Sequence, residues 1–146
     1  MADSEQAAGS PQALTGEWEP PAVGGVVELA VPALASFLPV VRAATAGLAA
    51  RLSLTFDEIE DLRIAVDEAC SMVLSLPGSP PVVLTCRYEV FADALGVRVS
   101  MPVDAIAALP AEHSFAWRVL RTHATDVRHA IDEGHAWIAL RKPRVS

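Results

Sequence analysis

The chain has few cysteines and no long hydrophobic run. Its 146 residues include two cysteines, Cys70 and Cys86, which form neither a C-x-x-C pair nor a Cys/His ligand pattern. The sequence therefore predicts two buried thiols and excludes a disulfide framework or a zinc site. No apolar stretch approaches the roughly 20 residues that a membrane-spanning helix needs. The first ten residues lack the basic and apolar segments of a signal peptide, so we expect a cytoplasmic protein with no membrane segment.

Basic charge is also scarce. The chain has 11 Lys and Arg residues against 18 Asp and Glu, which gives a formal net charge of -7. Because this field repels a polyanion, direct binding to nucleic acid or to an anionic membrane is disfavoured, and a protein is the expected partner. The four histidines, at positions 113, 123, 129 and 135, lack the HxxxH and HExxH spacings, so no metal site is predicted.

The length and composition predict one folded domain preceded by a tail. The chain is 52% hydrophobic, enough to bury a core at this size. Residues 1–24 are rich in Ala, Gly, Pro, Ser and Glu and have no apolar period, which is typical of a disordered tail. Trp18 could dock on the domain, dock on a partner or simply be exposed. Residues 25–146 form the predicted domain.

Two helices follow a first strand. The run VVELAV, residues 26–31, predicts the strand. A helix over about 38–52 begins near Pro39, which is tolerated in a first turn, and its apolar spacing leaves Arg42 and Arg51 outside. Thr55 and Glu58 form the T-x-x-E pattern of a capping box and begin a second helix, which ends at Leu-Pro-Gly 76–78. Its predicted core stripe is Phe56, Ile59, Leu62, Val66, Ala69 and Val73. A second row on its flank is Ile64, Glu68 and Met72.

The second half of the chain predicts two hairpins separated by a helix. Residues 82–88 and 94–100 form the first hairpin. Ser114 could cap a short helix, and residues 126–131 and 135–142 flank a turn as the closing hairpin. This order predicts an α+β two-layer sandwich, a largely antiparallel sheet with helices on one face.

The string FDEIEDLRIAVDEAC, residues 56–70, carries a family resemblance. Together with the element order and SFAWRVLRTHATDV, residues 114–127, it resembles anti-sigma factors of the serine-kinase type. These form a branch of the histidine-kinase-like ATPase superfamily, and the second string is similar to actinobacterial members. The resemblance covers roughly residues 25 to 142 and implies the histidine-kinase-like ATPase fold.

The resemblance implies a catalytic pair on the second helix, of which one member is replaced here. In catalytic members a Glu acts as general base on a serine hydroxyl, and an Asn four residues later holds the magnesium ion of ATP. Glu68 matches the Glu, but Met72 occupies the Asn position. A thioether is a poor ligand for magnesium, which takes oxygen ligands. Without the resemblance, Asp67 and Glu68 would be interpreted as solvated helix charges.

A second motif of the family, an Asp followed by glycines, also departs from its pattern. Extending the alignment without gaps from Glu68 places this motif on SMPVDAI, residues 100–106. Ser100 stands where the Asp reads adenine. Pro102 and Asp104 fall near the positions of the family's glycines. The backbone freedom that glycine gives is therefore lost, and a carboxylate would lie near the position of the ATP phosphates. The glycines that begin the third helix in the family are missing too. The sequence predicts a degraded nucleotide site with no cofactor; the alternative is a register shift in residues 101–113 that conceals a divergent Mg-ATP site.

The partners implied by the resemblance are an alternative sigma factor and a STAS-type anti-anti-sigma protein. Arg42 is the first candidate for contact with the sigma factor, because a guanidinium can pair bidentately with a carboxylate. It could equally be a solvated helix arginine, and Arg51 and Glu60 are weaker candidates. The STAS protein would release the sigma factor. Catalytic members phosphorylate it on serine; without that activity, control would come from another kinase, from competition or from redox chemistry on the cysteines.

Three hypotheses follow. The leading one is a cytoplasmic anti-sigma factor that sequesters an alternative sigma factor and has little or no kinase activity. The second is an active serine kinase of a STAS-type protein, and the third is an unrelated α+β metabolic enzyme. Relatives also pair through their sheets, so residues 26–31 and 82–86 could support a homodimer, although burial within the chain gives the same pattern.

Overall fold

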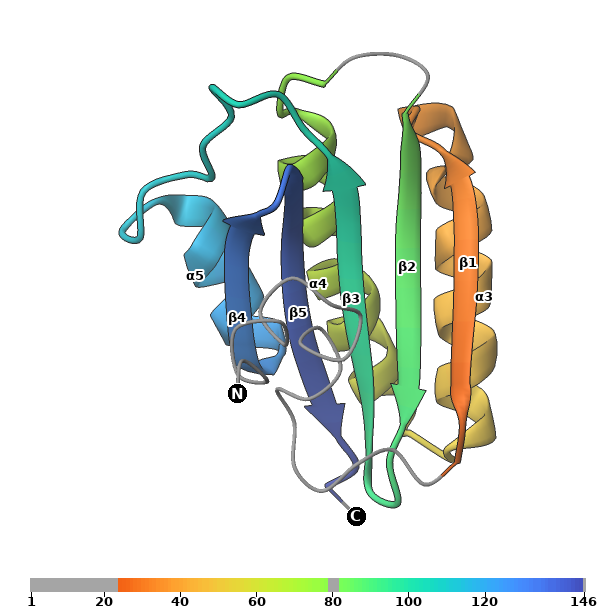
Figure 1. Ribbon diagram of the computed structural model, residues 1–146. Helices are drawn as coiled ribbons and strands as arrows, with labels where there is room; N and C mark the ends of the chain where they lie inside the picture. The colour runs from red at the N-terminus through yellow and green to blue at the C-terminus, as the bar shows by residue number, and fades with distance from the viewer. Residues whose placement is uncertain (1–23, 79–81, 146) are drawn as a thin grey trace, which may run out of the picture.

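The computed structural model describes residues 24–78 and 82–145. A five-stranded sheet has the order β1-β2-β3-β5-β4, and each neighbouring pair is antiparallel. The helices cover one face of this sheet (Figure 1). The predicted α+β two-layer sandwich is therefore confirmed. The elements are β1 Val26–Pro32, the short 3-10 helix η1 Ala35–Phe37, α3 Leu38–Arg51, α4 Phe56–Leu74, β2 Val83–Val90, β3 Ala94–Pro102, α5 Phe115–His123, β4 Thr125–Asp132 and β5 His135–Pro143.

Helix α3 starts where the sequence predicts it to start. Pro39 lies in its first turn, where a missing N–H costs no helical hydrogen bond. Its buried residues are Leu38, Val41, Thr45 and Ala49. The Thr45 hydroxyl donates to the Val41 carbonyl at 2.8 Å and lies 2.8 Å from the Tyr88 hydroxyl of β2. The contact with Tyr88 ties the helix to the sheet. Arg42 and Arg51 are exposed, as predicted.

The capping box at the start of α4 is confirmed. The Thr55 Oγ1 accepts from the Glu58 N–H at 3.1 Å, and the Glu58 Oε1 accepts from the Thr55 N–H at 2.7 Å. The second Glu58 oxygen accepts from the Val145 N–H at 2.7 Å. These backbone hydrogen bonds, Thr55 first and then Val145, lower the pKa of Glu58. The cap therefore also holds the chain beyond β5.

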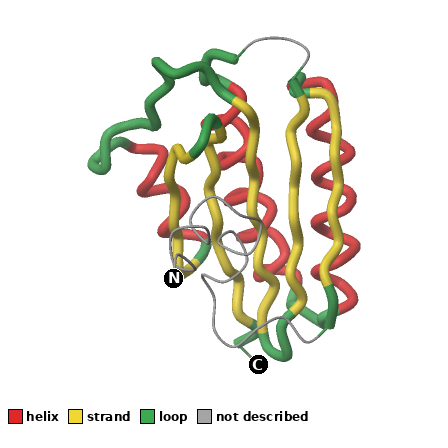
Figure 2. The backbone as a smooth tube through the Cα atoms, in the orientation of Figure 1, coloured by secondary structure: helices red, strands yellow, loops and turns green. Residues whose placement is uncertain are grey.

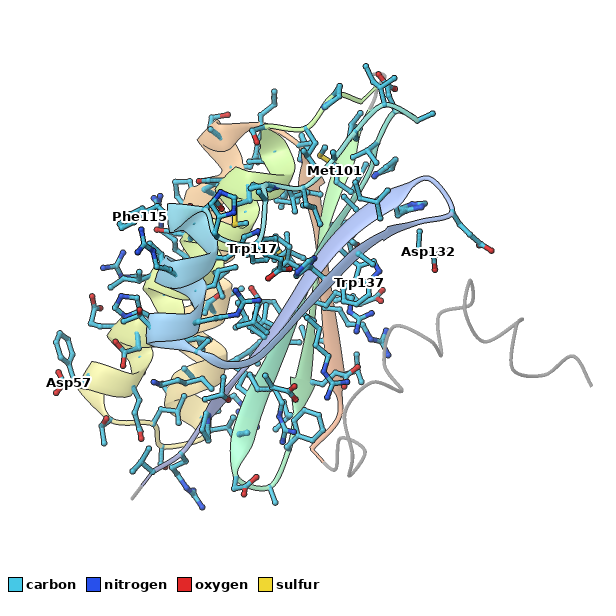
Figure 3. The ribbon with its side chains drawn as sticks, turned by 90° about the vertical axis from the view of Figure 1, so that its left-hand side faces the viewer. Asp57, Met101, Phe115, Trp117, Asp132 and Trp137 are labelled. Carbon is cyan, nitrogen blue, oxygen red and sulfur yellow. The ribbon has the colours of Figure 1, made fainter. Side chains whose placement is uncertain are left out.

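The predicted core stripe of α4 is wrong at Phe56. Leu62, Val66, Ala69 and Val73 are buried, but Phe56 is 75% exposed. It occupies the first helical position, and Figure 3 shows this turn, marked by Asp57, at the outer side of the helical layer. A helical period identifies which side of a helix is apolar, but not how far along its length the partner layer extends.

Strand alternation sorts the sheet residues into two faces. On β3, Leu95, Val97, Val99 and Met101 belong to the core cluster under the helices. Arg98 and Ser100 alternate with them and therefore face the other way. On β5, Ile138 and Leu140 face the helices, while Trp137 and Ala139 lie on the opposite face, paired across the ladder with Ser100 and Arg98.

The sheet order decides which strands could pair with another chain. Strand β2 lies between β1 and β3, so the prediction that residues 82–86 could form a pairing edge is wrong. Residues 26–31 lie in β1, at an edge of the sheet.

The structure bears on the predicted tail and on the predicted lack of a membrane segment only within the described residues. Apart from Gly24, the predicted tail of residues 1–24 lies outside the described residues. Within the described ranges, no helix combines the length and the apolar character needed to cross a membrane.

Candidate functional site

Helix α4 carries the candidate site and has two different flanks. Asp67 faces α3, because it pairs with Arg42. Asp61 faces α5, because its carboxylate lies 2.9 Å from the His123 Nδ1. Glu68 and Met72 follow Asp61 by 7 and 11 residues, which at 3.6 residues per turn places them on the flank of α5. Glu68 therefore lies on the flank of α4 opposite to the one that Arg42 of α3 contacts through Asp67.

Met72 is part of the core. It is 5% exposed and belongs to the same buried cluster as Trp117 and Leu120 of α5. The sequence places it on a flanking row beside Glu68, which is itself only half-buried. Met72 therefore lies inside the core and not on an open row beside Glu68. Its thioether offers no oxygen to a cation, and magnesium takes oxygen ligands.

Ser100 is separated from Glu68 and Met72 by the sheet. It lies on the face of β3 that carries no described helix, between Thr85 and Trp137, while the next residue, Met101, is buried under the helices. A shift of one residue along a strand exchanges the two faces of a sheet. Residue 100 is therefore not a neighbour of the residues that the resemblance assigns to the same nucleotide site.

The backbone after β3 is held on both sides. The Val103 N–H donates to the Gly134 carbonyl, and the Asp104 N–H donates to the Pro77 carbonyl, both at 2.8 Å. A Cβ on Gly78 would lie 3.0 Å from the Pro102 carbonyl oxygen, so this close approach favours glycine. Phosphate-binding loops present unpaired backbone N–H groups to the ligand, and the amides of residues 103 and 104 are already paired.

A polar and aromatic cluster ties residues 103–114 to α5 and β4. The Trp117 Nε1 donates to the Pro110 carbonyl at 2.9 Å. The Trp117 ring stacks on His129 with centroids 4.0 Å apart. Glu112 lies 2.6 Å from the His129 Nε2 and 3.1 Å from Arg121, and these hydrogen bonds, that of His129 first, lower the pKa of Glu112. Figure 3 shows Trp117 between α5 and the sheet, and Figure 2 shows the loop that it holds.

The opposite flank of α4 forms an ion-pair row with α3. The Arg42 Nε donates to both Asp67 carboxylate oxygens, at 2.9 and 3.0 Å. Arg63 lies 3.8 Å from Asp67 and 2.7 Å from Glu60. The sequence names Arg42 and Glu60 as separate candidates for partner binding. The structure links them through Asp67 and Arg63, which were not candidates for partner binding. We call Arg42, Asp67, Arg63 and Glu60 the ion-pair row.

Arg51 does not belong to this row. It is exposed in the last turn of α3, where a cation is favoured by the partial negative charge of the helix end. A structural role is sufficient to account for its position.

A separate cluster joins α4, α5 and β5. The Asp61 carboxylate lies 2.9 Å from the His123 Nδ1 and accepts a hydrogen bond from the Lys142 Nζ at 3.1 Å. The hydrogen bond with His123, followed by that with Lys142, lowers the pKa of Asp61. Because three elements far apart in the sequence meet there, we interpret this cluster as structural.

The two cysteines are free and buried, as predicted. A hydrogen bond with Cys86, together with burial, raises the pKa of the Cys70 thiol. This thiol is therefore a poor nucleophile and a poor metal ligand. Over residues 24–78 and 82–145, no three His, Cys, Asp or Glu side chains form a group that could hold a metal ion.

An apolar pocket of about 380 Å³ lies where α4 and β3 end. Its lining is Pro32, Ala33, Leu34, Leu74, Leu76, Gly78, Val82 and Met101. Neither Glu68 nor Met72 contributes to it. The pocket is therefore distinct from the flank on which the family resemblance places nucleotide.

The fold is the histidine-kinase-like ATPase fold, as the sequence predicted. A solved structure of the RsbU and RsbW domains of a Mycobacterium tuberculosis protein superposes with a TM-score of 0.58, over 82% of this chain and 32% of that one, at 13% identity.

Curated relatives share part of this sequence. Part of the chain is 37% identical over 76 residues to the serine-protein kinase RsbW of Bacillus subtilis, and 35% identical over 74 residues to that of Halalkalibacterium halodurans. Each match includes 51% of this chain and 48% or 46% of the relative, so the chain spans about half the length of the curated relatives it matches. No protein-family model matches. The predicted resemblance to proteins of the serine-kinase type is confirmed by these relatives, which are named serine-protein kinase RsbW.

Proposed function

We propose that the protein is an anti-sigma factor that binds and sequesters an alternative sigma factor, and that it has little or no kinase activity. The observation that carries the second half is Met72. In a chain similar to serine-protein kinases named RsbW, a 5% exposed thioether occupies the position at which the family resemblance requires a magnesium ligand.

One further feature supports a degraded nucleotide site. The backbone at Val103 and Asp104 is bonded to Gly134 and Pro77, so its amides are not available for phosphate.

The ion-pair row is the proposed partner surface. Only the Nε of Arg42 is used by Asp67, and the arginine side chain is 44% exposed. Its two terminal nitrogens have no hydrogen-bond partner in the described part of the chain. They can therefore accept a carboxylate of the sigma factor end-on while Asp67 fixes the guanidinium from the side. Asp67 acts as a positioning residue for Arg42.

The test is titration calorimetry of the full chain against a panel of purified alternative sigma factors. We expect one of them to bind at a fixed stoichiometry without nucleotide. Because a hydrogen bond to a charged group contributes about 1.5–3 kcal/mol, Arg42→Ala should weaken binding about 10- to 100-fold. Arg118→Ala, which removes an exposed arginine from α5, is the matched control and should leave affinity unchanged. No binding to any sigma factor, or equal loss in both variants, contradicts the proposal.

A second function, an active serine kinase of a STAS-type protein, is favoured by one observation. Glu68 keeps the general-base position, and the relatives are named as serine-protein kinases. In this case Mg-ATP would be the cofactor. Transfer of labelled phosphate from ATP to a STAS-type protein, lost in Glu68→Gln, would establish it.

The STAS-type protein also belongs to the leading proposal, as the competitor that releases the sigma factor. This account places the protein in the cytoplasm, where sigma factors act. A homodimer would use β1, whose outer edge is not paired in the described part of the sheet.

A further inference from the structure

The ion-pair row has an alternating order of charge. Glu60, Arg63 and Asp67 follow one another along α4, and Arg42 of α3 continues the row. The signs are therefore negative, positive, negative and positive. The four side chains are between 26% and 44% exposed, and ion pairs at this exposure add little to the stability of a fold. Because the side chains are already held in place, they lose little conformational freedom when a partner binds.

The two ends of the row keep the largest unbalanced charge. Asp67 lies between two arginines, and Arg63 lies between two acids. Glu60 and Arg42 each have one oppositely charged neighbour, and the described part of the chain supplies neither with a second. Because the attraction between charges falls with distance, a charged group of a partner is drawn most strongly to these ends. The row therefore presents a negative end at Glu60 and a positive end at Arg42.

Helix α4 sets the distance between the two ends. Glu60 and Asp67 are 7 residues apart, which is about two turns and about 10.5 Å along the helix axis. Both therefore lie on the same side of α4. The Arg42 Nε donates to the Asp67 oxygens at 2.9 and 3.0 Å, so the positive end lies beside Asp67. An acid and a base on a partner helix match this separation when they are also about two turns apart.

The outward side of α3 leaves room for such a helix. Ala43, Gly47 and Ala50 recur there at helical spacing and are exposed. A Cβ placed on Gly47 would meet no atom within 4 Å. The axes of two packed helices lie about 8–10 Å apart, depending on the size of the side chains between them. A partner helix can therefore lie close along α3 with its charged side turned to the row.

We infer that one helix of the partner binds along the ion-pair row, with an acid against Arg42 and a base against Glu60, about two turns apart on one face. This inference rests on the proposed function and names the chemistry of the partner at the same surface. The order of charge also fixes the direction of the partner helix. A reversed helix would place like charges together at both ends of the row, which is strongly unfavourable.

Charge reversal tests the inference, with the full chain and the sigma factor that binds it in the titration panel. Glu60→Lys and Arg42→Glu should each weaken binding at least about tenfold, because each brings like charges together. The matched controls are Glu133→Lys on the β4–β5 turn and Arg118→Glu on α5, which change the net charge equally at exposed positions. They should change the affinity less than about twofold at about 0.15 M salt, which screens distant charges.

Rescue by the partner locates the two contacts. Reversing one base of the sigma factor should restore its affinity for Glu60→Lys, and reversing one acid should restore its affinity for Arg42→Glu. We expect the two rescuing positions to lie about seven residues apart on one helix, which is the spacing of two turns.

The other outcomes overturn the inference. If Arg42→Glu weakens binding but Glu60→Lys does not, the inference is wrong and the proposed function stands. Rescuing positions on two different elements, or no rescue of Glu60→Lys by any base, also contradict a single helix along the row. If no sigma factor binds the wild-type chain, the proposed function fails and the inference fails with it.

Discussion

Replacing Met72 with asparagine should destabilise the protein without creating a nucleotide site. The substitution installs the residue that the family resemblance expects at this position. Met72 is 5% exposed and belongs to the hydrophobic core. Removing a buried methionine costs about 1.5–3 kcal/mol of apolar transfer. An amide buried there without partners costs about 1–3 kcal/mol more.

The expected loss is therefore about 2.5–6 kcal/mol in the free energy of unfolding, with a fall of roughly 10–20 °C in Tm. Urea unfolding followed by circular dichroism measures it. Met72→Leu, which keeps volume and apolarity, should cost less than about 1.5 kcal/mol. An asparagine variant as stable as the wild type would show that position 72 has polar partners or space for water. If that variant also bound Mg-ATP, the reasoning about a closed site would be refuted.

Three further predictions concern the contacts that hold the fold. Thr55→Ala, which removes the capping box, should lower stability by about 1 kcal/mol in urea unfolding, whereas Ser114→Ala at the start of α5, where the side chain makes no cap bond, should cost less; equal losses would refute the capping argument. The pKa of Asp61 is lowered from 3.8, so its charged form stabilises the protein above about that pH, and this stabilisation is lost as the pH falls through the lower folded pKa. Plots of the free energy of unfolding against pH for wild type and Asp61→Asn should therefore converge in acid. Parallel plots would contradict this. Trp117→Phe removes the hydrogen bond to Pro110 and should speed amide exchange in residues 103–113, whereas Phe115→Leu, at a 72% exposed position, should not; unchanged exchange in both variants would remove the proposed tether.

The fold could be predicted from the sequence because its signals are local. The capping box at Thr55, the proline in the first turn of α3 and the period-2 runs of the two hairpins each depend on residues a few positions apart. Few packing arrangements accommodate this order of helices and strands, so a sheet with all helices on one face could be expected. Phe56 was predicted wrongly because periodicity does not show where a helix extends past its sheet.

The site could be predicted only in outline. Glu68 and Met72 could be identified because they lie four residues apart on one helix. Ser100 could not be placed correctly, since one residue of register decides which face of β3 it occupies. The bonds from Arg42 to Asp67 and from Glu112 to His129 join positions 25 and 17 residues apart, and no periodic pattern links such pairs.

The measurement that tests the central claim most directly is isothermal titration of the full chain with Mg-ATP and Mg-ADP, with the RsbW protein of Bacillus subtilis as the positive control. The account predicts no binding heat at protein concentrations at which the control binds. Micromolar binding of either nucleotide would contradict it and would show that the flank of Glu68 and Met72 carries a divergent nucleotide site.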